Sequence, residues 1–171
     1  DASSRLFVNL RDVHGWTYGA YSVGGETALY APAVLSSDGD GAATGPALQE
    51  MFGELRRLGA EPAPAEELAA RQAYMTRVFP LRLETPFSIA SMLATRKLNG
   101  LPDDYCDRYR DDVLAVGPDA ARAAAARWLP VDRAVVVVVG VAAEVLEACR
   151  AVGSVTLTDI DGVRGETYPA L

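Results

Sequence analysis

Apolar residues recur at helical spacing near the start of the chain. Leu6, Leu10 and Val13 lie three and four residues apart, which predicts an amphipathic helix over residues 4–13. A serine just before this stretch can cap the helix, and Gly15 can end it because glycine adopts the left-handed conformation common after helix ends.

Alternating apolar positions follow directly and predict a pair of strands. The sequence WTYGAYSV predicts a strand over residues 16–23, GGET predicts a turn, and ALYAPAVLSS predicts a second strand over residues 28–37. Pro32 indicates an edge strand or a bulge, since proline donates no backbone hydrogen bond. The period of two would place four side chains on one face of the first strand: Trp16, Tyr18, Ala20 and Ser22.

The rest of the chain alternates between helical stripes and short apolar runs. Thr44 and Gly59 bracket an amphipathic stripe, and Thr85-Pro86 starts a further helix that Asn99-Gly100 ends. Further helices are expected over residues 65–79, 103–114, 119–129 and 142–152, a buried strand over residues 134–140, and a final strand over residues 155–160. This order predicts an α+β fold in which helices layer on one face of a sheet. We expect a single domain over residues 1–171, because no repeat or linker divides the chain.

Composition excludes several classes of function. The formal net charge is −7 and no basic stripe is present, which argues against nucleic-acid binding because phosphates must be neutralised by clustered lysine and arginine. The longest apolar run, AVVVVVGVAA, is too short to cross a bilayer as a helix. Cys106 and Cys149 show no paired spacing, so they are most simply two buried thiols.

Recognisable catalytic motifs are missing from the sequence. The only histidine is His14, and neither His-x-x-Glu-His nor its inverse occurs, whereas a catalytic zinc needs three protein ligands. His14 is better explained as a helix-end residue that the helix dipole favours. We therefore expect no metal site in this chain. No P-loop, calcium loop or Gly-x-Ser-x-Gly motif is present either.

The polar corner at residues 4–22 carries a specific likeness. Its sequence, SSRLFVNLRDVHGWTYGAYS, resembles the start of the C-terminal half-domain in the pitrilysin/insulinase-type zinc peptidases, also called inverzincins. The family includes bacterial zinc proteases, the mitochondrial processing peptidase and the core subunits of respiratory complex III. The matching positions are Ser4-Arg5-Leu6, Leu10-Arg11-Asp12, Gly15 and Tyr18. Similar segments, such as GELRRLGAEPAPAEELAARQAY and FPLRLETPFSIASMLA, continue the likeness to about residue 162.

The resemblance implies a fold and a site. Such half-domains are duplicated and enclose a chamber; the N-terminal half carries zinc on His-x-x-Glu-His, and the C-terminal half adds an Arg and a Tyr seven residues apart. Arg11 and Tyr18 match this pair in type and spacing. The tyrosine hydroxyl would stabilise an oxyanion, the arginine would hold a substrate carbonyl, and Trp16 can line the cleft. The structural alternatives are that Arg11 pairs with Asp12 or another carboxylate, that Tyr18 is a half-buried strand aromatic, and that Trp16 packs the strand.

This likeness leads to a prediction of function. We expect the zinc-free half of a metalloendopeptidase, inactive alone and binding no cofactor itself. The expected partners are a zinc-bearing His-x-x-Glu-His domain or subunit and an unstructured peptide, in a dimer. Bacterial relatives imply a periplasmic location, with the cytoplasm as the alternative. The chain is expected to lack the leading strand and helix of its half-domain. The alternative is a non-catalytic scaffold like the respiratory core subunits.

Overall fold

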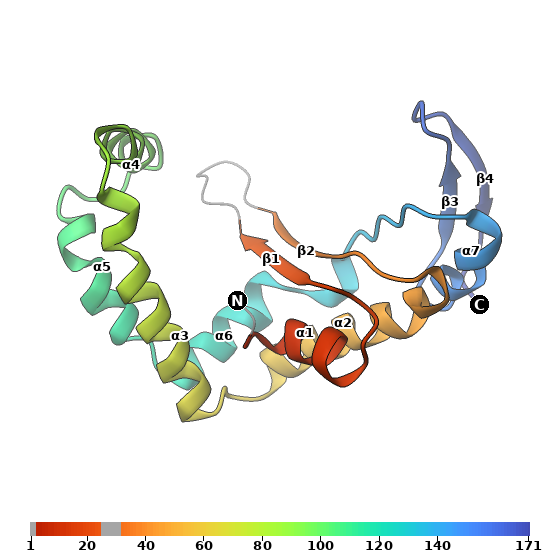
Figure 1. Ribbon diagram of the computed structural model, residues 1–171, viewed down its shortest axis with the longest axis horizontal. Coiled ribbons are helices and arrows are strands. Elements are labelled where there is room, and N and C mark those ends of the chain that lie inside the picture. Colours follow the sequence, from red (N-terminus) through yellow and green to blue (C-terminus); the bar gives the residue numbers. More distant parts are fainter. Residues whose placement is uncertain (1–2, 25–31) are drawn as a thin grey trace. The chain divides into compact units, whose positions relative to one another are not determined.

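The computed structural model describes residues 3–24 and 32–171 and contains both helices and short antiparallel strand pairs (Figure 1). The predicted α+β class is confirmed. The chain divides into two compact units. The first comprises the described residues within Asp1–Ser22, Leu35–Arg56 and Val131–Leu171, and the second those within Val23–Val34 and Arg57–Pro130.

The first unit begins with the helix that the sequence predicts. The helix starts as α1 (Arg5–Phe7) and continues as the π-helical turn η1 (Val8–Val13). The side chain of Ser4 caps its start, accepting a hydrogen bond from the Phe7 amide at 3.4 Å. Its widened second half is the one feature that apolar spacing did not indicate.

A two-stranded sheet follows, formed by β1 (Ala20–Gly24) and β2 (Ala33–Ser37). The first strand therefore begins four residues later than predicted, and Pro32 directly precedes β2. The predicted turn after Gly24 and the predicted start of the second strand lie outside the described residues. The predicted common face is wrong, because Ala20 is buried whereas Tyr18 is exposed.

Helix α2 (Thr44–Ala60) begins after a short 3-10 turn, η2 (Gly41–Ala43), which Asp40 caps. The Asp40 carboxylate accepts a hydrogen bond from the Ala42 amide at 3.3 Å. Near its start α2 packs closely on α7 (Ala142–Arg150): a Cβ placed on Gly45 would lie 2.9 Å from the Cβ of Ala148. Glycine at this position thus allows the two helices to approach.

The last part of the first unit is a second hairpin, of which the sequence predicted only one strand. Strand β3 (Val155–Thr158) pairs antiparallel with β4 (Arg164–Tyr168), with Val155 opposite Tyr168. The Asp159 carboxylate accepts hydrogen bonds from the amides of Asp161 and Val163, at 3.0 and 2.8 Å, and so holds the connecting turn. The sequence of β4, RGETY, has no apolar alternation, which is why periodicity did not reveal it.

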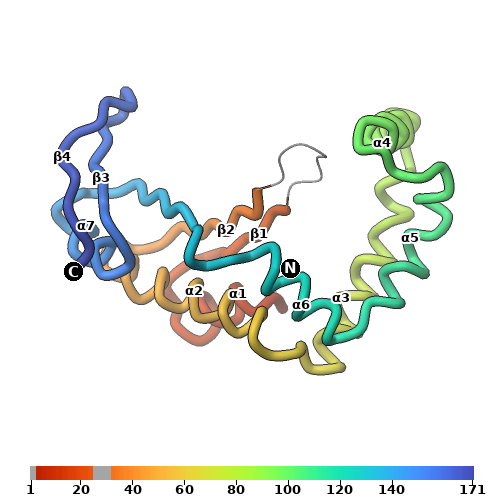
Figure 2. Tube along the Cα trace, turned by 180° about the vertical axis from the view of Figure 1, so that it is seen from behind, coloured from red at the N-terminus to blue at the C-terminus, as the bar shows by residue number. Residues whose placement is uncertain are grey.

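The predicted buried strand at residues 134–140 is wrong. In the part of the chain that the structure describes, residues 134–139 join no sheet, and Figure 2 shows them as the light-blue segment leading toward α7. The described strands therefore form two separate two-stranded sheets where the sequence predicted one. A β-branched run supplies propensity, but a strand forms only where another backbone offers hydrogen bonds.

The second unit is helical, as its sequence predicts. It contains the predicted helices as α3 (Ala65–Val78), α4 (Pro86–Leu98), α5 (Tyr105–Leu114) and α6 (Pro118–Trp128), with the 3-10 turn η3 (Pro80–Leu83). Thr85 caps α4, and Gly100 follows its end at a φ of 64°. The buried ring of Phe79 stacks on Tyr109 at 4.0 Å between centroids. Of the helices that the structure describes, none has the length and apolar character needed to span a membrane.

Candidate functional site

The corner between η1 and β1 is closed by three backbone hydrogen bonds. The amide of His14 donates to the carbonyl of Asn9 at 3.2 Å, that of Gly15 to Arg11 at 3.0 Å, and that of Trp16 to Leu10 at 2.9 Å. Gly15 has a φ of 67°, a backbone conformation that residues other than glycine rarely adopt. The helix end and the chain that leaves it are therefore held in one geometry.

Two neighbouring side chains anchor this corner to the first unit. Leu10 is the one large side chain that is fully buried among the described residues. The Asn9 amide nitrogen donates to Glu50 at 2.8 Å and to Glu54 at 3.3 Å, both on α2. The turn that bears Arg11 is thus fixed by apolar packing on one side and by hydrogen bonds on the other.

A hydrogen-bonded clasp determines where Tyr18 points. The hydroxyl of the buried Thr17 accepts from the Gly19 amide at 3.0 Å and donates to the Gly19 carbonyl at 2.8 Å. The Ser37 hydroxyl on β2 donates to the same carbonyl at 3.1 Å. This local turn interrupts strand alternation before β1, so Tyr18 projects into solvent with 93% of its surface exposed while Ala20 is buried.

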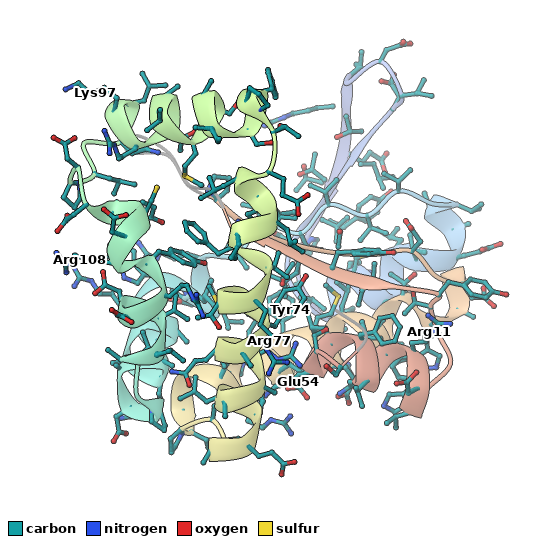
Figure 3. All side chains as sticks on the ribbon, turned by 60° about the vertical axis from the view of Figure 1, so that its left-hand side comes forward. Arg11, Glu54, Tyr74, Arg77, Lys97 and Arg108 are labelled. Atoms are coloured by element: carbon teal, nitrogen blue, oxygen red, sulfur yellow. The ribbon has the colours of Figure 1, made fainter. Side chains whose placement is uncertain are left out.

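Arg11 is also exposed, on the last turn of η1, and is labelled in Figure 3. Its guanidinium carbon lies 4.9 Å from the centroid of the Phe7 ring, a cation–π contact that holds the side chain along the helix. Within the described part of the chain, Arg11 forms no ion pair, with Asp12 or with any other carboxylate, and the Tyr18 hydroxyl has no hydrogen-bond partner. The structural alternatives for these two residues therefore find no contact to support them.

His14 and Trp16 form a stacked pair at the same corner. Their ring centroids are 4.0 Å apart and the planes differ by 10°. Trp16 is half-buried, and its carbonyl oxygen lies 2.6 Å from where a Cβ on Gly39 would stand. Packing thus accounts for much of what Trp16 does in this structure, and its contact with substrate stays a prediction.

Sequence reasoning missed the residues that position the pair. Thr17, Ser37 and Gly39 shape the corner, although none carries catalytic chemistry. A threonine two residues before a glycine is a signal for a side-chain-closed turn and could have revealed the Thr17 clasp. The roles of Ser37 and Gly39 depend on contacts across about twenty residues of chain, which local patterns do not contain.

In the part of the chain that the structure describes, the side chains that could ligate zinc do not form a site. Among the described residues no three or more His, Cys, Asp or Glu side chains gather closely enough to hold a metal ion. The ring of His14 is engaged with Trp16. Zinc on a partner half stays a prediction.

Comparison with protein families identifies the segment that bears this corner. Residues 1–75 match the model of the Peptidase M16 inactive domain. The match covers less than half of the 171-residue chain. The match confirms the likeness to the C-terminal half-domain of pitrilysin-type peptidases, and it includes both Arg11 and Tyr18. No curated protein matches the chain.

The matched family indicates what kind of domain residues 1–75 resemble. The M16 inactive domain is the zinc-free half of peptidase-like proteins, and it pairs with another domain or subunit. The likeness that the sequence shows beyond residue 75 stays a prediction. The likeness to particular members of the family, the identity of the pairing domain and the substrate also stay predictions.

Proposed function

We propose that this M16 inactive domain supplies Arg11 and Tyr18 to a peptide that is cleaved at a zinc site on its partner half. One observation carries the proposal: Tyr18 is 93% exposed on a corner held by hydrogen bonds, within the segment that matches the family. An exposed tyrosine on a corner held by hydrogen bonds is available to contact another molecule, since among the described residues its own hydroxyl has no hydrogen-bond partner.

Tyr18 is suited to stabilise the oxyanion of peptide hydrolysis. When a peptide carbonyl is attacked, its oxygen gains negative charge, and a hydroxyl aimed at that oxygen donates a hydrogen bond that strengthens in the transition state. The Thr17 clasp and the hydrogen bond from the Trp16 amide to the Leu10 carbonyl hold the backbone around Tyr18. Little reorganisation is then needed when the charge develops, which is the condition for an effective donor.

Arg11 is suited to hold the peptide in register. Its guanidinium is planar, stays charged and has several donors, so it can bind a backbone carbonyl of an extended peptide while the Phe7 ring supports its other face. Because this binding acts on substrate and transition state alike, its loss should raise KM more than it lowers kcat.

The test is cleavage of a quenched, unstructured peptide by this chain assembled with its zinc-bearing partner. We expect Tyr18→Phe to lower kcat about 10²–10³-fold, as removal of one oxyanion donor does. Tyr21→Phe is the matched control, because Tyr21 is another exposed tyrosine, on β1. This variant should cleave the peptide at the wild-type rate. Equal rates for the two variants would refute the role of Tyr18.

The same assay separates catalysis from scaffolding. We expect Arg11→Ala to raise KM with a smaller change in kcat, and Arg11→Lys to recover only part of the loss because lysine lacks the planar fork. If the assembled wild type holds zinc and does not cleave the peptide, the scaffold function replaces the peptidase function.

A further inference from the structure

The first helix leaves an apolar side chain in solvent at its end. Leu6, Leu10 and Val13 would share one buried face of an α-helix, because four residues turn through about 400° and three through about 300°. Leu10 is fully buried, yet Val13 is 69% exposed. The reason is that residues 8–13 form the π-helical turn η1, in which hydrogen bonds span five residues and each residue turns through a smaller angle.

Two backbone hydrogen bonds define this π register. The His14 amide donates to the Asn9 carbonyl, five residues earlier, at 3.2 Å, and the Trp16 amide donates to the Leu10 carbonyl, six residues earlier, at 2.9 Å. In the alternative α register, the His14 amide would bond the Leu10 carbonyl, four residues earlier. The two registers therefore compete for the same carbonyl.

The register determines the geometry of the candidate site. In the α register, Val13 would turn toward the face on which Leu10 is buried, and burial of this apolar side chain would favour that register. The chain would also leave the helix at a different point. Because Arg11 lies on the helix and Tyr18 lies beyond its end, a change of register would move one relative to the other.

Two side-chain contacts hold η1 in the π register. Near its start, the Asn9 amide nitrogen donates to the carboxylates of Glu50 and Glu54 on α2, at 2.8 and 3.3 Å, and bonds to charged acceptors are among the strong ones. At its end, the His14 ring stacks on Trp16 with the ring centroids 4.0 Å apart. Since His14 directly follows the π turn, the α register would rotate its ring away from Trp16.

We propose that Asn9 and His14 are positioning residues, which hold η1 in the π register and thereby set the place of Tyr18 relative to Arg11. Neither residue needs to touch the substrate. The inference rests on the proposed function where it treats Arg11 and Tyr18 as substrate residues, whereas the register is a property of this chain by itself. It would also explain why the only histidine of the chain stands at this corner.

The alkylation rate of a thiol at position 13 reports the register. The reporter chain carries Val13→Cys together with Cys106→Ser and Cys149→Ser. Adding Asn9→Ala or His14→Ala should slow alkylation about tenfold or more, because the α register turns position 13 toward the protein. Asn9→Gln keeps the amide donor and should keep most of the original rate. Unfolding would speed the reaction, so a slower rate cannot come from a damaged fold.

A second reporter position shows whether the effect is local. Val163→Cys is the matched control, because Val163 is 63% exposed in the same unit, and its alkylation rate should not change in either variant. An unchanged or faster rate at position 13 in both variants would overturn the proposal. A slower rate in only one variant would remove the positioning role of the other residue.

Peptide cleavage by the assembled peptidase separates this inference from the proposed function. We expect Asn9→Ala to lower kcat/KM about tenfold, with little further loss when it is added to Tyr18→Phe, because both changes act through Tyr18. Losses that multiply in the double variant would refute that route. Slower alkylation with unchanged cleavage would refute the proposed function and leave the register in place. Unchanged alkylation, with cleavage still impaired by Tyr18→Phe, would refute this inference alone.

Discussion

Removing the Thr17 hydroxyl tests the mechanism that positions Tyr18. Thr17→Val keeps the shape of the buried side chain and deletes the bonds to the Gly19 amide and carbonyl, at 3.0 and 2.8 Å. The Gly19 carbonyl keeps its bond from Ser37, whereas the amide loses the partner that the structure shows for it, in a buried position. The variant is therefore expected to loosen the corner while leaving its apolar packing in place.

The size of the effect follows from these two bonds. Each contributes about 0.5–1.5 kcal/mol net, and leaving a buried amide unpaired costs about 1–3 kcal/mol, so we expect a loss of about 2 kcal/mol. With a urea dependence of about 2 kcal/mol per molar, the midpoint of unfolding should fall by about 1 M. Thr17→Ser is the control, because it keeps the hydroxyl and removes only a methyl group.

The assay is urea unfolding followed by the fluorescence of Trp16. The chain has two tryptophans, and replacing Trp128 by phenylalanine leaves Trp16, which directly precedes Thr17, as the reporter. If Thr17→Val and Thr17→Ser unfold at the same midpoint, the clasp contributes nothing and the explanation for the direction of Tyr18 fails. In the assembled peptidase that we propose, Thr17→Val should also lower kcat although the Thr17 side chain is itself buried.

Three further predictions concern other parts of the structure. Gln72→Met should destabilise the second unit by about 1–2 kcal/mol in chemical denaturation. The Gln72 amide nitrogen donates to the carbonyls of Val113 and Leu114 at the end of α5, at 3.0 and 3.1 Å, and to that of Val116 just after it, at 3.0 Å. An unchanged unfolding midpoint would contradict this capping role. Gly45→Ala should lower the free energy of unfolding, although alanine favours a helix by about 1 kcal/mol over glycine, because the new Cβ would lie 2.9 Å from that of Ala148. Adding Ala148→Gly to this variant should restore the stability, and failure to restore it would refute the close approach of the two helices. Burial raises the pKa of the Cys149 thiol, so the folded chain holds the thiol proton more tightly than the unfolded chain does. The stability that this difference contributes is fully present below the ordinary thiol pKa and is lost as the pH rises through the pKa of the folded state. With the other cysteine replaced by serine, the pH midpoint of alkylation should be higher for the folded chain than in urea, and equal midpoints would refute the shift.

Local signals in the sequence determined the helices. Thr85 and Pro86 start α4, Gly100 ends it at a positive φ, and Ser4 caps α1. These predictions succeeded because a helix forms its hydrogen bonds between residues three to five positions apart, so its cap, stripe and stop lie within one window of sequence. The Arg11 and Tyr18 pair was visible for the same reason, since its spacing lies within one motif.

The strands and the direction of the site were decided by tertiary structure. Tyr18 faces solvent because the Thr17 hydroxyl closes a turn on Gly19, and the Ser37 hydroxyl of β2 bonds the same Gly19 carbonyl. The alternation of apolar residues over 16–22 gives no sign of either bond. Tertiary structure also decided β4, which the sequence analysis did not predict, and residues 134–139, which were expected to form a buried strand. A strand needs a second backbone to hydrogen-bond with, from elsewhere in the chain or from another chain. β-branched residues therefore favour an extended backbone but do not by themselves form a strand.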